Sequence, residues 1–472
     1  MSIFMQSCLS LFFKDFEILP GALRKWQTPE SSRNPGVRAE DPTGPQSAAG
    51  LAESSSDLVS GMSAKKIRIG IVVGSDFRGN HGGGIQPETK TFLKYAKERP
   101  FEIVLLGMST AKDEPVGQVS KRLIYGREYP FIPLFYHDTV RYANRKPLIP
   151  VRVQTFLAYV LRRRLVDSLH LDILYLHAPQ ALPFFWSKRQ PILYHMHNSQ
   201  ESDVVYSRYA IARTRAFGHI YDMVVQNILE KADQFIVIDQ DSYDLYTKRI
   251  PGKKECFHLL PPSIDADEFR PIPGFNRRES RACFGLPAEG KIILCVGRLA
   301  WNKGVDLVVT AFSLVAKQVA DTYLAIAGSG QERPRLEALV HELRLDGRVF
   351  FLGYVPHLPS PDLPRLYNCV DVMALGSYRE SLGLVIIEAL ACGVPVVSTT
   401  VGIAPTVIRN GVTGYLVQSR EPGEMADRIL RIVRDGEFDG SACVDAAHQY
   451  PGSSEQICDV IQNMCVDNAN LN

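Results

Sequence analysis

The chain has 472 residues, of which 45% are hydrophobic and 22% are charged, and its formal net charge is +2. This length is enough for two or three domains, and the near-zero net charge gives no support to a nucleic-acid-binding protein. The nine cysteines follow no regular spacing and form no Cys-x-x-Cys pair, which argues against a zinc site or a disulfide framework. No run of 18 apolar residues occurs, so we expect no transmembrane helix, reduced thiols and a cytoplasmic protein.

Residues 1–64 do not read as part of a folded domain. Their apolar start lacks a preceding cationic segment and is interrupted by Lys14 and Asp15, so it makes a poor signal peptide. Residues 27–61 are rich in Pro, Ser, Gly and Ala, which predicts disorder. Met62 opens a segment typical of the start of a Rossmann-like chain. We therefore expect a disordered leader, which is either a regulatory tail or the product of a start codon upstream of the native one.

The first predicted domain covers residues 65–265. It begins with an apolar strand at 67–73, a glycine-rich loop at 79–84 and a helix at 89–97. A strand, a glycine loop and a helix in this order can hold a phosphate group at the helix N-terminus. The loop is not a Gly-x-Gly-x-x-Gly fingerprint, so dinucleotide binding is not indicated.

Histidines follow two later strands of this domain. The strands at 173–177 and 192–198 carry His177, His195 and His197 near their carboxyl ends, which is where ligands bind in open α/β sheets. His195 and His197 share one face because strand side chains alternate. They could be metal ligands, but the sequence shows no third ligand nearby, and we expect no metal.

The stretch 151–166 predicts a basic amphipathic helix. Its apolar positions fall on one face, and three arginines crowd its end at 162–164. One interpretation is peripheral contact with an anionic membrane surface. The other is a core-packed helix with a solvated basic end. The apolar positions are Val153, Phe156, Leu157, Val160 and Leu161.

A proline-rich linker at 266–290 leads to the second predicted domain at 291–440. Asp265 and Asp267 form an Asp-x-Asp pair just before it, and we expect this pair to belong to the interdomain connection and not to a metal site. A strand at 292–296 is followed by a loop with Arg298 and Lys303 and by a helix from 305. Two cations beside a helix N-terminus form an anion site.

Alternating strands and helices then predict a parallel sheet. The tail at 441–472 has apolar residues at helical spacing, which predicts a last helix.

Glu380 and Glu388 stand eight positions apart. On one continuous helix they would lie about 80° and about 12 Å apart and could not serve one small ligand. If Glu380 lies in a loop before the helix, both carboxylates can face a ligand at the helix N-terminus. Acceptor-only side chains beside exposed N–H groups suit a molecule with both hydroxyls and phosphates, such as a nucleotide-sugar.

Several segments, in order, resemble the retaining glycosyltransferases of family 4 over about residues 65–465. GRLAWNKG from Gly297 is similar to the diphosphate-binding segment of that family, and ESLGLVIIEALACG from Glu380 is similar to its Glu-x7-Glu signature. The segments from Leu259, Ala327 and Phe350 also match. The resemblance implies a GT-B fold, in which two Rossmann-like parallel-sheet domains face an interdomain cleft. It also implies that the last helix, in the tail at 441–472, crosses back to the first domain.

The resemblance also implies the activity. The expected reaction transfers a sugar from a nucleotide-sugar to a hydroxyl of a saccharide or lipid-linked acceptor, with retention of configuration and without a metal or cofactor, in cell-surface polysaccharide or glycolipid synthesis. The expected location is cytoplasmic, with peripheral contact at the inner face of the membrane as an open alternative. The implied catalytic residues are Glu380, His197 (with His195 as second choice), Arg298 and Lys303. The implied donor-binding residues are Gly83, Gly84, Arg298, Lys303, Glu380, Ser381, Gly383, Leu384 and Glu388.

The sequence departs from the family pattern at two places. Gly376 stands where a proline usually precedes Ser377, and Thr406 stands where a glutamate usually follows the Gly-Gly-x-Pro motif. Thr406 leaves open an alternative, which is a catalytically silent nucleotide-sugar-binding module of the same fold. A phosphorylase of this fold is a third interpretation, but no lysine has the context of a pyridoxal phosphate site.

Overall fold

The computed structural model describes residues 66–78, 85–138, 161–177, 190–197, 229–356, 362–380, 382–434, 438–450 and 452–469, with a few more positions at 154–158 and 226–227. The chain divides into two units, Met1–Ser63 and Ala64–Asn472, and every described residue belongs to the second. The predicted leader at 1–64 and the loop glycines Gly83 and Gly84 lie outside the described residues.

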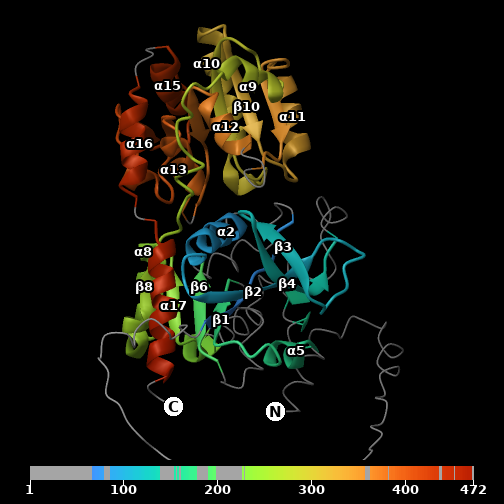
Figure 1. The fold of residues 1–472 in the computed structure, drawn as a ribbon. Coiled ribbons are helices and arrows are strands. Elements are labelled where there is room, and N and C mark those ends of the chain that lie inside the picture. Colours follow the sequence, from blue (N-terminus) through green and yellow to red (C-terminus); the bar gives the residue numbers. More distant parts are fainter. Residues whose placement is uncertain are drawn as a thin grey trace, which may run out of the picture. The chain divides into compact units, whose positions relative to one another are not determined.

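The first sheet has eight strands in the order β3-β4-β2-β1-β5-β6-β7-β8 (Figure 1). Its pairings are parallel except at the β3 edge, where β3 and β4 run antiparallel. The parallel sheet confirms the predicted fold class, while the antiparallel edge was not predicted. The strands are β1 (Ile67–Val72), β2 (Phe101–Ser109), β3 (Ser120–Ile124), β4 (Arg127–Tyr136), β5 (Ile173–Leu176), β6 (Ile192–Met196), β7 (Gln234–Val237) and β8 (Phe257–Leu259).

The second sheet has six parallel strands in the order β11-β10-β9-β12-β13-β14. Its strands are short, and all except the edge strands β11 and β14 are largely buried, as expected for a parallel sheet covered by helices on both faces. They are β9 (Lys291–Val296), β10 (Thr322–Ala327), β11 (Val349–Gly353), β12 (Val372–Leu375), β13 (Val396–Thr399) and β14 (Gly414–Val417).

Helices alternate with the strands, as the sequence pattern predicts. In the first half they are α2 (Ile85–Ala96), α5 (Arg163–Asp167), α8 (Gln240–Arg249), the 3-10 helix η4 (Pro251–Cys256) and α9 (Arg277–Cys283). In the second half they are the 3-10 helix η5 (Trp301–Lys303), α10 (Val305–Gln318), α11 (Arg333–Glu342), α12 (Asp362–Asn368), α13 (Leu384–Ala391), α14 (Ala404–Val407), α15 (Pro422–Val433), α16 (Gly440–His448) and α17 (Ser454–Ala469). Among the described helices, none is both long and apolar enough to cross a membrane.

Each sheet has a point where the strand order reverses. β1 pairs with β2 on one side and with β5 on the other, and β9 pairs in the same way with β10 and β12. The segments that follow two such strands diverge, and ligands bind in the crevice between them in open α/β sheets. The sheets therefore direct attention to the segments after β1 and β5 and to the loops after β9 and β12.

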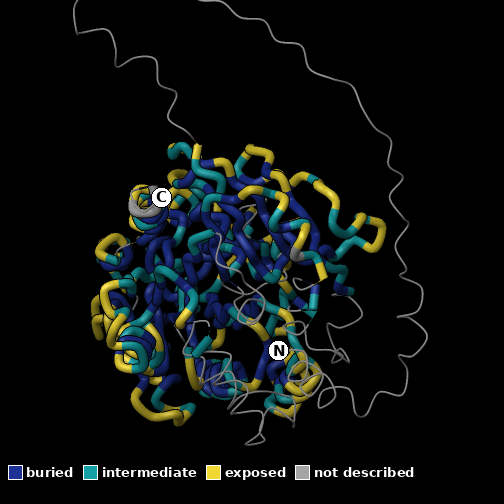
Figure 2. Tube along the Cα trace, turned by 90° about the horizontal axis from the view of Figure 1, so that it is seen from below, coloured by how far each residue is buried: buried dark blue, intermediate teal, exposed yellow. Residues whose placement is uncertain are grey.

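Two hydrophobic clusters of buried residues belong to each sheet, and buried residues fill the interior of the described trace (Figure 2). One cluster of the first sheet contains buried residues of β1, β2 and α2 together with residues from the end of the chain. Helix α17 supplies these, and it packs along α2. Arg99 reinforces the contact by donating to the Gln462 side chain at 2.8 Å. The last helix thus completes the core of the first sheet, and its contributing residues are Ile457, Cys458, Ile461 and Met464.

The Asp-x-Asp pair lies against α2. Lys94 Nζ is 2.6 Å from a carboxylate oxygen of Asp265 and 2.6 Å from one of Asp267. Asp265 is buried, so this charge requires the lysine as its partner. The pair therefore joins the segment before the linker to α2.

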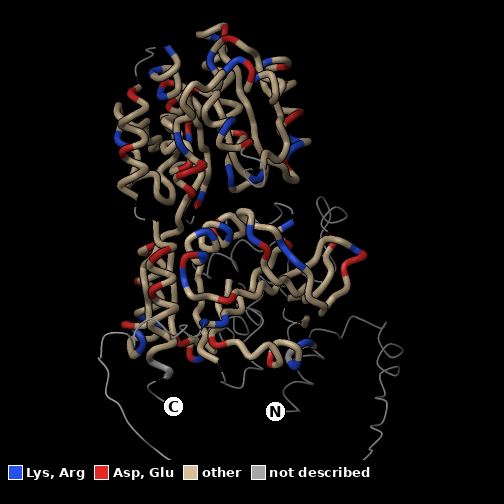
Figure 3. Tube along the Cα trace, in the orientation of Figure 1, with Lys and Arg blue, Asp and Glu red and all other residues tan. Residues whose placement is uncertain are grey.

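The expected continuous helix at 151–166 is interrupted. Arg162 has a non-helical backbone (φ −110°, ψ 17°), and α5 begins after it. Leu161, predicted to lie on the apolar face, is 78% exposed, so that prediction is wrong. The core side is formed by Ala158 and Val166, with Leu165 packed against them. Val153, Phe156 and Val160 lie outside the described residues. Basic and acidic residues are interspersed along the described chain (Figure 3).

The packing of α17 gives a direct stability test. We expect Ile461→Ala to destabilise the full chain by about 2–5 kcal/mol, because Ile461 is fully buried and its truncation leaves a cavity. Val466→Ala in the same helix is the control, since Val466 is 58% exposed and such changes usually stay within about 0.5 kcal/mol. Urea unfolding followed by circular dichroism measures both. Equal effects of the two substitutions would contradict the packing of α17.

Candidate functional site

Two loops of the second sheet cross at a pair of glycines. Gly304 closes the loop after β9 with φ 54°, and a Cβ added to it would lie 2.0 Å from the carbonyl oxygen of Gly376 in the loop after β12. A Cβ on Gly376 would in turn lie 2.4 Å from the carbonyl oxygen of Gly304. The Tyr378 N–H donates to the Asn302 carbonyl at 2.9 Å. Only glycine fits at both positions, and this close approach brings the two loops together.

The crossing places Lys303 against Glu380. Lys303 Nζ lies 2.7 Å and 2.6 Å from the two carboxylate oxygens of Glu380. The Ser377 hydroxyl also donates to Glu380, at 2.6 Å. The side chains of Lys303 and Glu380 are only 19% and 10% exposed. The sequence assigned these residues to different parts of a ligand, whereas the structure shows them as one ion pair.

Arg298 stands at the start of the same loop, directly after β9. Its side chain is exposed, and among the residues that the structure describes its guanidinium makes no hydrogen bond or ion pair. A planar cation with five N–H donors is suited to phosphate oxygens. Arg298 is therefore a cation that an anionic ligand could engage without breaking an existing contact.

Two helices begin at these loops. Gly304 precedes α10 and Gly383 (φ 88°) precedes α13, and no described side chain caps either helix. Leu384 is the first residue of α13. Unpaired N–H groups and the helix dipole make such an N-terminus attractive to anions. Ser381, another predicted donor-binding residue, lies outside the described residues.

Glu380 lies in the loop before α13 and Glu388 lies within the helix, which is the arrangement that the sequence required for both to serve one ligand. Glu388 is partly exposed and accepts a hydrogen bond from the Tyr367 hydroxyl at 3.0 Å. Burial raises the pKa of Glu388 to about 7. Its charge therefore changes in the neutral range.

The residue that replaces the usual glutamate is near this loop. Thr406 is exposed on α14. The segment before it is attached to the Glu380 loop, because the Ile403 N–H donates to the Leu382 carbonyl at 2.7 Å. Thr406 therefore follows, three positions later, a residue that contacts the Glu380 loop.

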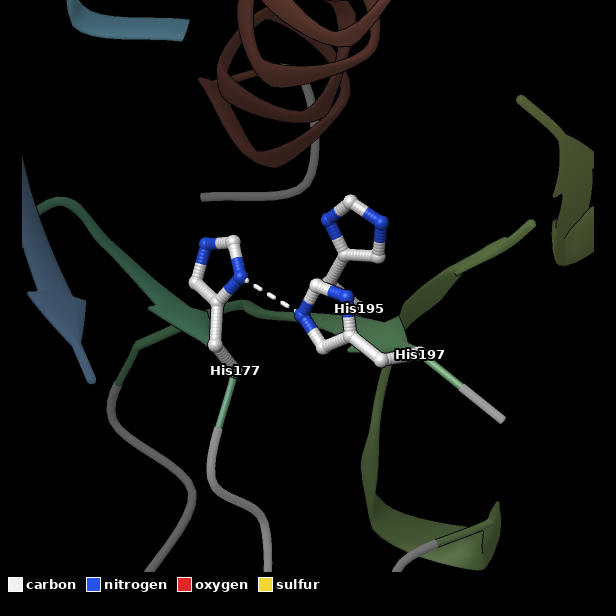
Figure 4. A group of neighbouring side chains, drawn as sticks. All are labelled: His177, His195 and His197. Atoms are coloured by element: carbon white, nitrogen blue, oxygen red, sulfur yellow. Dashed lines mark hydrogen bonds between the residues drawn. The ribbon is translucent and has the colours of Figure 1, made fainter. Parts of the chain in front are cut away.

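In the first sheet, three histidine rings lie together at the carboxyl ends of β5 and β6 (Figure 4). His177 Nδ1 lies 2.9 Å from His197 Nε2, and one nitrogen from each of the three rings lies within 4.8 Å of those of the others. The expectation that no third ligand stands near His195 and His197 is therefore wrong. β5 and β6 pair in parallel with Leu176 opposite Tyr194, so the next residues, His177 and His195, are neighbours.

Glu88 of α2 lies against the histidines and was missed by the sequence reasoning. Its carboxylate oxygens lie 3.1 Å from His195 Nε2 and 3.1 Å from His197 Nδ1. Burial would raise the pKa of Glu88, but the two histidines lower it more, so the net shift is downward. A glutamate on the core-facing side of the helix after the glycine loop was the available signal, since a buried carboxylate requires partners.

Comparisons with known proteins find a family match and relatives for the second half of the chain. The family model described as glycosyl transferases group 1 matches residues 276–444. The D-inositol 3-phosphate glycosyltransferases of Mycobacterium bovis and Mycobacterium tuberculosis are 36% identical over 214 residues, which is 44% of this chain and 42% of theirs. The match thus spans less than half the length of these relatives. Residues 276–444 form a glycosyl transferases group 1 domain.

Solved structures extend the likeness to both sheets. Sucrose-phosphate synthase from Thermosynechococcus elongatus superimposes with a TM-score of 0.68 at 23% identity, over 85% of this chain and 100% of its own. HepE from Anabaena, solved with UDP and glucose, gives 0.62 at 21% identity, over 84% of this chain and 99% of its own. At these identities the likeness establishes the fold alone, and the predicted GT-B architecture is confirmed.

The group 1 glycosyltransferase domain contains the crossing loops and both glutamates. Arg298, Lys303, Glu380 and Glu388 all lie within the matched residues, whereas the histidines and Glu88 lie before them. The predicted roles of these residues remain predictions.

Titration of Glu388 predicts a pH-dependent stability. A glutamate in the unfolded chain titrates near pH 4.3, and Glu388 in the fold titrates near 7. Folding therefore favours the protonated form, and this contribution is full below about pH 4.3 and is lost as the pH rises through 7.

We expect Glu388→Gln to raise the melting temperature relative to the unmodified chain more at pH 8 than at pH 5, by on the order of a few degrees. Differential scanning fluorimetry at the two pH values measures it. Glu342→Gln, at an exposed position on α11, is the control. A pH-independent effect of Glu388→Gln would contradict the buried titration.

Proposed function

We propose that the protein transfers a sugar from a nucleotide-sugar donor to a hydroxyl of a saccharide or lipid-linked acceptor, with retention of anomeric configuration. The observation that carries this proposal is the Lys303–Glu380 ion pair, held between two uncapped helix N-termini inside a group 1 glycosyltransferase domain. A cation, a carboxylate and free N–H groups in one place suit a ligand that contains both a diphosphate and a sugar.

In this proposal the donor separates the ion pair. A diphosphate competes with the Glu380 carboxylate for Lys303, and Arg298 and the first N–H groups of α10 and α13 add further charge stabilisation. Glu380, released from the lysine, then accepts hydrogen bonds from hydroxyls of the donor sugar. Glu388 holds the ribose hydroxyls, for which its ionised form is the better acceptor.

Cleavage of the donor develops negative charge on the leaving nucleoside diphosphate. Lys303, Arg298 and the helix N-termini stabilise this charge without a metal. The acceptor hydroxyl attacks on the face from which the diphosphate leaves, and the diphosphate oxygen takes its proton, so no covalent nucleophile is needed. His197 is positioned near the transferred sugar.

The comparisons support the substrate class without fixing it. HepE is described in complex with UDP-glucose, and another neighbour, WaaG, is described as involved in lipopolysaccharide biosynthesis. We propose a role in cell-surface polysaccharide or glycolipid synthesis, in the cytoplasm. Contact of the basic stretch 151–166 with the inner face of the membrane would bring the enzyme to lipid-linked acceptors, and the exposed Leu161 and Arg164 suit such contact.

A second candidate is a silent nucleotide-sugar-binding module. Thr406 favours it, because a carboxylate is missing from a segment attached to the Glu380 loop. Nucleotide binding without turnover of any donor and acceptor pair would support this candidate.

Substitution of Lys303 tests the phosphate assignment. We expect Lys303→Ala to lower turnover at least about 10²-fold, since removing one stabiliser of transition-state charge typically costs about 10²–10³-fold. Lys317→Ala, an exposed lysine in the last turn of α10, is the matched control and should retain turnover. The readout is release of nucleoside diphosphate. Full activity of Lys303→Ala would overturn the assignment.

Thermal stabilisation by nucleotides tests the donor site before any acceptor is known. At 100 times the dissociation constant, UDP or GDP should stabilise the full chain by about 2.7 kcal/mol. We expect one of the two to do so, equally with and without EDTA, and Glu388→Ala to lose the effect. No stabilisation by either nucleotide, or stabilisation that needs a divalent metal, would count against the proposed site.

A further inference from the structure

Four side chains of β5, β6 and the residues that follow them lie in one line of close polar contacts with Glu88 of α2. The Tyr175 hydroxyl lies 2.8 Å from His195 Nδ1, and His195 Nε2 lies 3.1 Å from one oxygen of Glu88, although these two atoms are not aligned as a hydrogen bond. The other oxygen of Glu88 lies 3.1 Å from His197 Nδ1, and His197 Nε2 lies 2.9 Å from His177 Nδ1.

His177 ends this line with an atom that has no partner. Its Nε2 is buried and makes no hydrogen bond within the described part of the chain, and the residue is only 5% exposed. An unsatisfied buried polar atom costs free energy unless a ligand or water supplies the missing bond. His177 directly follows β5, beside the point where the strand order of the first sheet reverses, which is a place where such folds bind ligands.

The line also fixes which nitrogen carries each proton. Burial raises the pKa of Tyr175 and lowers the pKa values of His177 and His195, so at neutral pH the tyrosine is protonated and these two histidines are neutral. The ionised Glu88 requires an N–H on each ring nitrogen that faces it. His195 therefore carries its proton on Nε2 and accepts from Tyr175, and His197 carries a proton on Nδ1.

These proton positions also determine which nitrogen of His177 carries its proton. In a neutral His197 with its proton on Nδ1, Nε2 is an acceptor, so His177 donates to it from Nδ1. The free Nε2 of His177 is then a bare acceptor that suits a hydroxyl group.

A metal site is the competing interpretation of three clustered histidines. The contacts do not favour it, because His195 and His197 each direct one nitrogen at Glu88, and the second nitrogen of His195 is engaged by Tyr175. The rings stack and do not converge on one point (Figure 4).

We propose that His177 Nε2 accepts a hydrogen bond from a substrate hydroxyl, and that Glu88 is the positioning residue that keeps it an acceptor by fixing the proton of His197. The hydroxyl belongs either to the transferred sugar or to the acceptor. The inference deepens the proposed function for this second part of the site, but the proton arrangement itself does not depend on that function.

The first experiment reads the protons directly. In the full chain labelled with 15N-histidine, two-bond proton–nitrogen spectra report which ring nitrogen is protonated, and single His→Gln variants assign the signals. We expect the proton on Nε2 of His195 and on Nδ1 of both His197 and His177. A proton on Nε2 of His177 would overturn the proposal, as would one equivalent of a tightly bound transition metal in the same sample.

Glu88→Gln provides the perturbation. An amide presents one acceptor and one donor, so at least one of the two rings facing it must move its proton to its other nitrogen. Glu102→Gln, a partly exposed glutamate of β2 paired with Arg68, should leave all three tautomers unchanged. Identical histidine spectra for Glu88→Gln and the unmodified chain would contradict the role of Glu88.

Binding and kinetics then locate the hydroxyl. We expect His177→Phe to weaken binding of the substrate that carries the hydroxyl by about tenfold. This is the effect expected from losing one hydrogen bond to a neutral acceptor. If the hydroxyl is on the donor, affinity for UDP-glucose or GDP-mannose falls while affinity for the free nucleotide does not. If it is on the acceptor, the acceptor KM rises instead. His258→Gln, on β8, is the control. If neither the donor affinity nor the acceptor KM changes in His177→Phe, the role of His177 is overturned. If the unmodified chain and every variant fail to bind nucleotide, that result counts only against the proposed function.

Discussion

The contact between the backbones of Gly304 and Gly376 is the constraint on which the second domain's site depends. β9 and β12 are neighbours only because the strand order reverses between them, and their loops can approach to van der Waals distance only without side chains at the crossing. This approach holds Lys303 against Glu380 and starts α10 and α13 beside one another. Any residue with a Cβ at either glycine would separate a cation, a carboxylate and two helix N-termini at once, so the electrostatics of the site follow from a steric fact.

Most of the second domain could be predicted from its sequence. The strand expected at 292–296 is β9 at Lys291–Val296, and the helix expected from 305 to 319 is α10 at Val305–Gln318. These segments are predictable because each is a short apolar run or a helix-period pattern bounded by glycine, so local sequence and burial agree. The positions of Glu380 before α13 and of Glu388 within it follow from the same reasoning, since Gly383 ends the loop.

Contacts between distant segments could not be predicted in the same way. The Lys303–Glu380 pair joins residues 77 positions apart. His177 and His195 are neighbours because β5 pairs with β6, and the local sequence does not show which strands pair. The contact of Glu88 with two histidines also depends on how α2 lies on the sheet. Leu161 shows a different failure, because its burial was predicted from helical spacing alone, whereas the side that faces the core is the one that carries Ala158, Leu165 and Val166.

The packing of α17 has a consequence for synthesis of the chain on the ribosome. The first sheet is made early, yet part of its core is supplied by residues 457–464, which are translated after every strand of both described sheets. α17 therefore reaches α2 only after the whole second sheet has been translated, and until then the surface of α2 that it covers lacks its partner. The second domain, whose described core is built from residues 264–450, can close first. The first domain is therefore translated first but completes its core last.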